Sequence, residues 1–248
     1  MKPVKPFLLL ATRAEDRAAD EEYAAFLRFG GLSEDELVRV RLEQRPLRES
    51  VPRLDFDDWS GIVLGGSPFT TSDRAKTATQ LRVERDLDAL LDEVVQRDFP
   101  FLGACYGVGT LGVHQRGVVD GTYAEPVSGV TVELTSDGVT DALLGVLPPR
   151  FEAFVGHKEA VTRLPAHATL LASSASCPVQ AFRVGRHVYA TQFHPELDLP
   201  GIQVRVEIYQ DAGYFPPETL EELQTSLARH EVTAPPALVR RFVELYAR

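Results

Sequence analysis

Short apolar segments alternate with longer amphipathic segments through the first half of this 248-residue sequence. The apolar runs have the length of buried strands, whereas the amphipathic segments repeat their apolar residues at helical spacing. Leu87, Leu90, Leu91 and Val94, for example, are spaced as on one face of a helix. Strands that alternate with helices are typical of a parallel sheet with helices on both faces. This alternation limits the choice of folds more than any other feature of the chain.

The second half of the sequence has a different pattern, with several apolar strands separated by turns and then three helical segments. We expect strands over 7–11, 37–42, 62–64, 99–104, 130–134, 151–155, 170–173, 179–184 and 187–193. We expect helices over 15–29, 77–97, from about 106, and over roughly 201–212, 217–229 and 236–247. The fold class predicted is α/β, a flavodoxin-like three-layer α/β/α sandwich with a central, mostly parallel sheet. Residues 1–198 would form one domain, and 199–248 a helical C-terminal extension packed on it.

Charge and cysteine content exclude several classes of protein. The formal net charge is −10 and no cluster of basic residues occurs, which argues against nucleic-acid binding. Two cysteines cannot form a disulfide framework, and this fits a reducing compartment. No apolar run reaches the length of a membrane span and the N-terminus has no signal-peptide pattern, so we expect a cytoplasmic location with no membrane contact.

The most informative motif is Gly103-x-Cys105-x-Gly107, which follows an apolar strand and precedes a helix. A sharp strand-to-helix turn of this kind projects its central side chain above the carboxyl edge of the sheet, where α/β proteins bind ligands. The helix N-terminus beside the sulfur favours a thiolate, and the Tyr106 N–H can face a developing oxyanion. The alternative is a buried cysteine in an ordinary turn.

A second motif, His194-Pro195-Glu196, follows the strand that ends at Phe193. In an extended segment residues i and i+2 point the same way, so the imidazole and the carboxylate are expected to lie close together. A cysteine nucleophile needs a base, and that base needs a group that fixes its tautomer. The alternative is a surface histidine beside a solvated glutamate.

A third motif, Gly65-Gly66, ends another apolar strand. Its backbone N–H groups could complete an oxyanion site together with the N–H of Tyr106, and each such donor can contribute about 3 kcal/mol to transition-state stabilisation. A tight turn that needs glycine is the alternative. His114, His167, His187 and His230 have no partners at metal-ligand spacing, so we assign no metal and no cofactor.

Taken together, these motifs resemble those of the class I glutamine amidotransferases, and the glutaminase domain of GMP synthetase in particular. The stretch 64–68 is similar to the oxyanion loop of that family, 103–107 to its nucleophile elbow and 192–196 to its His-Pro-Glu signature. The stretch 156–165 resembles the segment that covers the family's glutamine pocket, and the resemblance extends over about residues 5–197. It implies Cys105, His194 and Glu196 as the catalytic triad. It also implies an oxyanion and substrate site that includes Gly65, Gly66, Tyr106, His157 and Gln192.

The resemblance also implies a reaction. Cys105 would attack the side-chain amide of glutamine to form a γ-glutamyl thioester, and His194, oriented by Glu196, would protonate the departing ammonia and then activate water. The sequence departs from the family at Gly109, where members usually carry a substrate-binding glutamine. Either another residue takes this role, or the substrate is a larger γ-glutamyl compound.

Three functions therefore remain open from the sequence. The first is a glutaminase that releases ammonia to a separate synthetase subunit, because no phosphate-binding motif of a fused synthetase is present. The second is a free-standing γ-glutamyl hydrolase, which an open pocket at Gly109 would favour. The third is a non-catalytic regulatory subunit, which the intact cysteine, histidine and glutamate argue against. The extension could close the site, form a homodimer or contact a partner.

Overall fold

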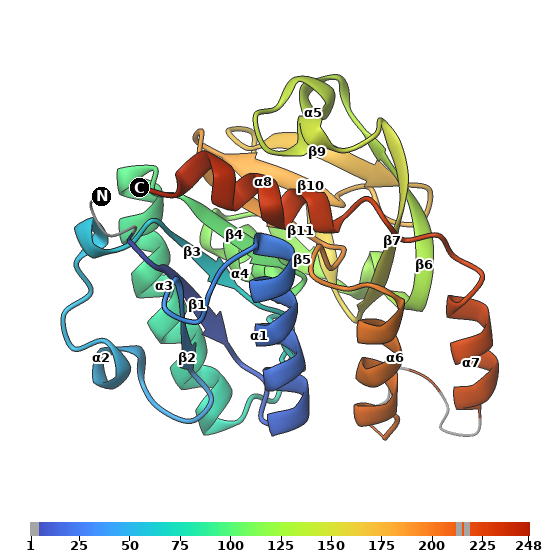
Figure 1. Ribbon diagram of the computed structural model, residues 1–248, viewed down its shortest axis with the longest axis horizontal. Coiled ribbons are helices and arrows are strands. Elements are labelled where there is room, and N and C mark those ends of the chain that lie inside the picture. Colours follow the sequence, from blue (N-terminus) through green and yellow to red (C-terminus); the bar gives the residue numbers. More distant parts are fainter. Residues whose placement is uncertain (1–4, 212–214, 216–218) are drawn as a thin grey trace.

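A nine-stranded sheet passes through the centre of the protein, as the computed structural model shows for residues 5–211, 215 and 219–248 (Figure 1). Its five parallel strands are, in spatial order, β2 (Leu37–Arg41), β1 (Phe7–Ala11), β3 (Gly61–Leu64), β4 (Phe101–Ala104) and β11 (Val188–Thr191). The sheet continues with four antiparallel strands, β10 (Ala181–Val184), β9 (Thr169–Ser174), β6 (Glu125–Leu134) and β7 (Arg150–His157). A separate antiparallel pair joins β5 (Val118–Asp120) to β8 (Ala160–Arg163).

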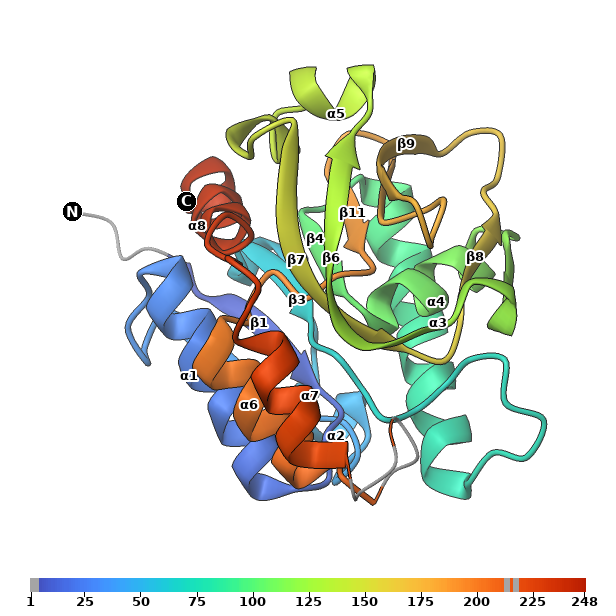
Figure 2. The same cartoon turned by 90° about the vertical axis from the view of Figure 1, so that its right-hand side faces the viewer.

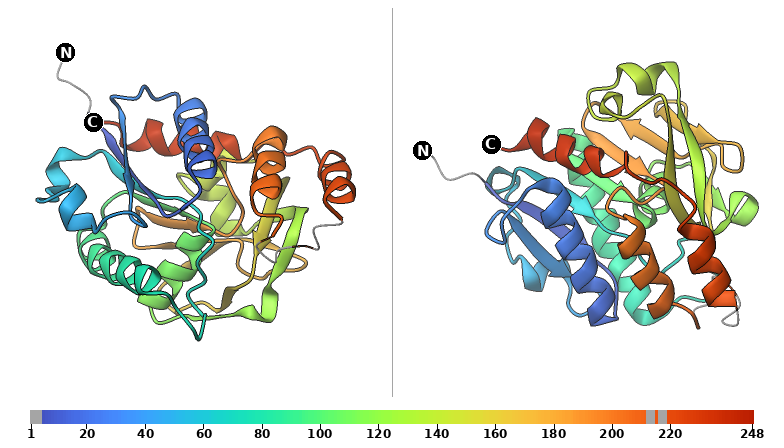
Figure 3. Two further views of the ribbon diagram at one scale, coloured as in Figure 1. Left: turned by 90° about the horizontal axis from the view of Figure 1, so that it is seen from below. Right: turned by 45° about the vertical axis from the view of Figure 1, so that its right-hand side comes forward.

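Helices cover both faces of the parallel part of the sheet, where β1, β3, β4 and β11 are buried along their whole length and the edge strand β2 is only partly buried. In β1, Leu8 and Leu10 belong to the cluster under α3 (Ala78–Arg97) and α4 (Tyr106–His114). Phe7 and Leu9 belong to the opposite cluster, under α1 (Asp16–Gly30) and α8 (Pro236–Tyr246). The two helical layers are visible from below in Figure 3.

Two further helices, α6 (Leu199–Ile208) and α7 (Leu220–Leu227), lie in the same layer as α1 (Figure 2). They form a third apolar cluster, in which Ile202, Val206 and Leu227 pack against Phe154 of β7. The last helix, α8, returns across the sheet beside α1 and ends where the backbone of Lys5 donates a hydrogen bond to the carbonyl of Arg248, 2.7 Å away. Of these C-terminal helices, α6 is the one that lies beside the carboxyl ends of the parallel strands, next to the cavity described below.

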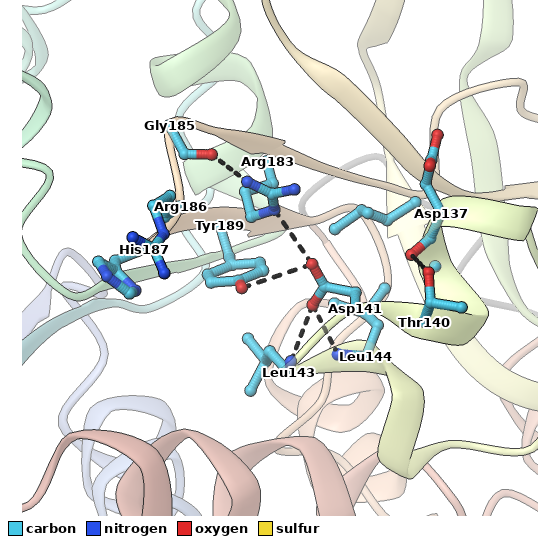
Figure 4. Close-up of polar contacts among 12 residues, drawn as sticks. Asp137, Thr140, Asp141, Leu143, Leu144, Arg183, Gly185, Arg186, His187 and Tyr189 are labelled. Atoms are coloured by element: carbon cyan, nitrogen blue, oxygen red, sulfur yellow. Dashed lines mark hydrogen bonds and ion pairs between the residues drawn. The ribbon is translucent and has the colours of Figure 1, made fainter.

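Short elements complete the connections between these larger ones. They are α2 (Leu47–Ser50), α5 (Ser136–Thr140) and the 3₁₀ turns η1 (Phe56–Asp58), η2 (Gly121–Tyr123) and η3 (Leu144–Val146). The carboxylate of Asp141, whose side chain is only 4% exposed, joins the loop before η3 to the sheet (Figure 4). It accepts hydrogen bonds from the backbone N–H groups of Leu143 and Leu144 at 2.8 and 3.1 Å and from Arg183 Nε at 3.0 Å. This carboxylate fixes the α5–η3 loop against β10.

The structure confirms the fold class predicted from the sequence, since helices cover both faces of a sheet whose first five strands are parallel. The strand expected over 130–134 is longer, because β6 begins at Glu125, and the β5–β8 pair was not expected. Residue 212 of one expected helix and residues 217–218 of the next lie outside the described residues. No helix in 5–211 or 219–248 is both long and apolar enough to cross a bilayer.

Candidate active site

Cys105 lies at the turn between β4 and α4, where its backbone has φ 53° and ψ −85°. A positive φ is strained for a residue with a side chain, and such strain concentrates at functional sites. The turn needs a glycine at 103, because a Cβ there would lie 2.8 Å from the Cα of Gly107. The first N–H groups of α4, including that of Tyr106, have no acceptor within their own helix. The structure therefore places the thiol above the sheet edge, as the motif predicted.

His194 and Glu196 follow β11, which is the neighbour of β4 in the sheet. His194 Nδ1 lies 2.7 Å from Glu196 Oε1, and the Glu196 side chain is completely buried. This bond leaves the other ring nitrogen for Cys105, which also interacts with the imidazole through its charge and a side-chain hydrogen bond. The three side chains expected to act together are thus adjacent, because the strands that carry them pair in parallel and end at the same edge.

The charges around His194 change its protonation. Burial by itself would lower the pKa of the imidazole, but the negative charges of Glu196 and Cys105 outweigh burial and raise it to about 9. Burial would likewise raise the pKa of Glu196, but the cationic His194 and Arg205 hold it well below its usual value. At neutral pH the pair is therefore an imidazolium beside a carboxylate, which is a form able to donate a proton to a leaving group.

The glycine loop differs from its expected role. The N–H of Gly65 donates to the carbonyl of Leu10, 3.0 Å away, and the N–H of Gly66 donates to Glu22 Oε1, 3.1 Å away. Neither N–H faces a free position in this conformation, so the expected pair of donors with Tyr106 is not formed. Glu22 lies on α1 and no motif links its charge to the site, so this bond could not be predicted from the sequence.

A small cavity connects Cys105 and His194 to the C-terminal helices. It has about 40 Å³ of free space, enough for a few water molecules. One wall is polar and contains Arg13, Ser67 and Arg205 with the two reactive side chains. The remaining lining residues are Val127, Val155, Gly156, Leu197, Ile202, Val206, Tyr209 and Phe215. Helix α6 therefore contributes directly to the wall of the site.

Two expected substrate-binding side chains do not line this cavity. His157 is buried with Nε2 2.7 Å from Glu125 Oε2 and Nδ1 2.8 Å from the carbonyl of Glu159. Gln192 is also buried and its N–H donates to the carbonyl of Gln180. In this conformation both side chains lie behind the cavity wall, and their role as substrate contacts stays a prediction from the sequence. The backbone of Gly156, next to His157, is what reaches the cavity.

Glu125, His157 and Cys177 also form the one group of potential metal ligands found among the described residues, with ligand atoms within 4.8 Å of one another. These atoms are already engaged, since Ser176 and Gln180 donate to Glu125 and the Cys177 thiol lies 3.6 Å from the carbonyl of Val179. Burial raises the pKa of Cys177 to about 11, which disfavours the thiolate that a metal needs. The group is therefore described as a hydrogen-bond network that supports the β6–β7 hairpin.

Gly109 does not open the pocket. The space beside it is filled by Glu159, and a Cβ at 109 would lie 2.6 Å from Glu159 Oε1. The Glu159 carboxylate accepts three hydrogen bonds from the loop 71–72: from the N–H and the hydroxyl of Thr71 at 2.7 and 2.8 Å, and from the N–H of Ser72 at 2.7 Å. The glycine therefore accommodates a carboxylate that fixes a loop, and the argument for a larger substrate at this position is lost.

Replacing Gly109 with alanine should destabilise the protein by about 1–2 kcal/mol, because overpacking displaces Glu159 and outweighs the better helix propensity of alanine. Urea unfolding measures this change. In a Glu159→Ala background the same replacement should stabilise by up to about 1 kcal/mol, since only the propensity remains. An equal effect in both backgrounds would show that Gly109 and Glu159 are not coupled.

The sequence did not reveal four residues around the site: Arg13, Glu22, Arg205 and Tyr209. Arg13 comes directly after Thr12 at the carboxyl end of β1, so the rule that ligands bind at this edge could have identified it. It is buried, with Nε 2.9 Å from Glu22 Oε1 and Nη1 3.3 Å from the Tyr209 hydroxyl. Burial disfavours its charge, but Glu22 and Tyr209 outweigh this effect and raise its pKa. Nothing in the local sequence marks the other three.

Comparison with known proteins gives a consistent result. Residues 35–201 match the family described as "Glutamine amidotransferase class-I". The GMP synthase [glutamine-hydrolyzing] of Hamiltonella defensa is 30% identical over 143 residues, 55% of this chain and 25% of the relative. The enzyme of the same name from Salmonella typhimurium is 29% identical over 149 residues, 58% of this chain and 26% of the relative. The match thus spans about a quarter of the length of these curated relatives.

Solved structures share the fold over nearly the whole chain. A glutamine amidotransferase from Thermotoga maritima superposes with a TM-score of 0.72 and 22% identity, covering 98% of each chain. A glutamine amidotransferase from Methylobacillus flagellatus gives a TM-score of 0.70 and 17% identity, covering 98% of this chain and 94% of the other. Both therefore have the C-terminal helical region within the superposed length.

Proposed function

Because the chain belongs to the class I glutamine amidotransferase family, we propose that it hydrolyses the side-chain amide of glutamine through a thioester on Cys105. The family match confirms the family and the cysteine-nucleophile enzyme class predicted from the sequence. The observation that carries the proposal is that a strained Cys105 and His194, which lies 2.7 Å from Glu196, line one cavity. A purely regulatory subunit would need none of these three groups.

In the proposed reaction the Cys105 sulfur attacks the amide carbon, and the negative charge moves to the carbonyl oxygen. The N–H of Tyr106 at the start of α4 is directed to stabilise that oxygen. The His194 imidazolium gives its proton to the amide nitrogen, ammonia departs and a γ-glutamyl thioester remains. The neutral imidazole then takes a proton from water, whose oxygen attacks the thioester and releases glutamate. Glu196 orients the ring and stabilises its charged form in both steps.

Gly66 would supply the second oxyanion donor only after its N–H leaves Glu22, so this role belongs to a conformation other than the one observed. Gly65 is part of the same loop, and its N–H is held by Leu10 of β1. Both glycines therefore enter the proposal as parts of a loop that must rearrange, and the N–H of Tyr106 is the other proposed donor.

We further propose that the released ammonia passes to a synthetase partner, since the matched curated relatives are GMP synthases [glutamine-hydrolyzing] and the match covers about a quarter of their length. Residues 1–198 would then be the amidotransferase domain and 199–248 a helical extension packed on it, which is consistent with the place of Arg205, Val206 and Tyr209 in the cavity wall. A cytoplasmic location and a homodimer stay predictions from the sequence.

The proposal is tested by incubating the protein with glutamine and, in parallel, with a γ-glutamyl dipeptide, while free glutamate is measured. Glutamate from glutamine, absent with Cys105→Ala, is the expected result. Glutamate from the dipeptide alone would replace the proposal with a γ-glutamyl hydrolase. If neither substrate reacts, addition of a candidate synthetase subunit with its substrates distinguishes partner-dependent activation from a non-catalytic protein.

A further inference from the structure

A buried arginine beside the reactive cysteine lacks the partners that its charge needs. Arg205 lies on α6 with its side chain 9% exposed, and its Nη1 makes no hydrogen bond to any described residue. Its ion pair with Glu22 Oε1 is 3.9 Å long, which is too far for a hydrogen bond. Arg13, the other arginine of the cavity, is by contrast bonded to the same carboxylate oxygen at 2.9 Å.

The charge of Arg205 is therefore only partly compensated. Burial lowers the pKa of its guanidinium, the nearby charge of Arg13 lowers it further, and Glu22 and Glu196 offset only part of this effect. Glu22 already accepts hydrogen bonds from Arg13 and from the N–H of Gly66. A buried charged group without hydrogen bonds is costly, and titratable groups perturbed in this way cluster at functional sites.

Arg205 lines the same cavity as Cys105 and His194. We propose that Arg205 binds the α-carboxylate of the glutamine whose side-chain amide is presented to Cys105. This inference rests on the proposed function and adds the group that orients its substrate. A guanidinium binds a carboxylate through two parallel hydrogen bonds, which fix the orientation of the ligand as well as its position.

The rest of the cavity suits the middle of such a molecule. Val155, Ile202 and Val206 supply apolar surface between the polar groups, and they match the two methylenes of a glutamine side chain. The cavity has about 40 Å³ of free space in the observed conformation, so it must widen to admit a whole glutamine. A carboxylate on Arg205 would then connect the substrate to the helix that covers it.

The test compares two substrates that differ only in the carboxylate: glutamine and 4-aminobutanamide, which is glutamine without that group. Ammonia release gives kcat/KM for the parent protein and for Arg205→Met, Arg205→Lys and Arg28→Met. We expect Arg205→Met to lower kcat/KM for glutamine by about 100-fold and that for 4-aminobutanamide by less than about threefold. Arg205→Lys should restore part of the difference, because it keeps the charge but loses the paired geometry.

Arg28→Met is the matched control, since Arg28 also contacts the α6 region, through Asp198 at 2.8 Å, but its side chain is 57% exposed and does not line the cavity. It should leave both substrates unchanged. A loss that is equal for the two substrates in Arg205→Met would overturn the proposal and make Arg205 a structural counter-ion for Glu22 and Glu196.

A binding measurement distinguishes failure of this inference from failure of the proposed reaction. Calorimetric titration of the Cys105→Ala protein with each compound measures recognition without turnover. One outcome is that the parent protein does not hydrolyse glutamine, but the Cys105→Ala protein binds it and Arg205→Met weakens that binding about 100-fold. This outcome would support the carboxylate site and refute the proposed reaction. If glutamine and 4-aminobutanamide bind equally well, or if neither binds, the carboxylate site is refuted.

Discussion

Replacing His194 with asparagine should lower kcat for glutamine hydrolysis by about 10³–10⁴-fold, because the variant loses the proton donor for ammonia and the base for water in the second step. Asparagine can still accept or donate one hydrogen bond near Glu196, so the fold should persist. His194 is buried and its 2.7 Å bond to Glu196 holds the imidazole in place, and asparagine offers no ring nitrogen to take over either proton transfer. Steady-state ammonia release measures the change, with circular dichroism as the check on folding.

The pH dependence of stability gives an independent measure of the same pair. Since the folded pKa of His194 is raised to about 9, its ion pair stabilises the protein fully below the unfolded pKa of about 6.5, and this contribution is lost as pH rises through about 9. The loss should amount to roughly 3 kcal/mol. Urea unfolding between pH 6 and 10 should show it for the parent protein and not for His194→Asn. Identical profiles would mean that His194 is not charged in the folded state.

The sequence predicted the parallel half of the fold well, because four of its five strands, β1, β3, β4 and β11, are short, buried and mainly apolar. It predicted the antiparallel half less well. The strand β6 begins at Glu125, five residues earlier than expected, because its buried carboxylate is paired with His157 and Gln180. Polar residues inside a strand break the hydrophobic pattern from which strands are predicted, and only the tertiary structure shows that they are satisfied.

The candidate site was likewise predictable only in part. Cys105, His194 and Glu196 each follow a strand of the parallel sheet, so local motifs were enough to place them at one edge. Arg205 and Glu22 reach the site from helices whose sequences carry no special motif, and tertiary packing alone brings them there. The same packing explains why Gly66 is not free, since its N–H is held by a carboxylate 44 positions earlier in the chain.

Replacing Glu22 with alanine should destabilise the protein by about 3–5 kcal/mol, a large fraction of the stability of an ordinary domain. Glu22 is completely buried, and it is the carboxylate that pairs with Arg13 at 2.9 Å and lies 3.9 Å from Arg205. Its removal leaves two buried guanidinium groups together and the N–H of Gly66 without its acceptor. Urea unfolding measures the loss, and Glu21→Ala is the control, because Glu21 is the exposed neighbour on the same helix.

Two further variants show whether this loss of stability comes from the missing negative charge or from the cavity that alanine leaves. Glu22→Gln keeps the size of the side chain and an oxygen for Gly66 but removes the charge, so it should retain most of the destabilisation if the arginine charges are its cause. A Glu22→Leu, Arg13→Met double variant removes one charge of each sign, and it should recover much of the stability. A small effect of Glu22→Gln with no recovery in the double variant would contradict the charge argument. Packing around α1 would then explain why Glu22 is needed.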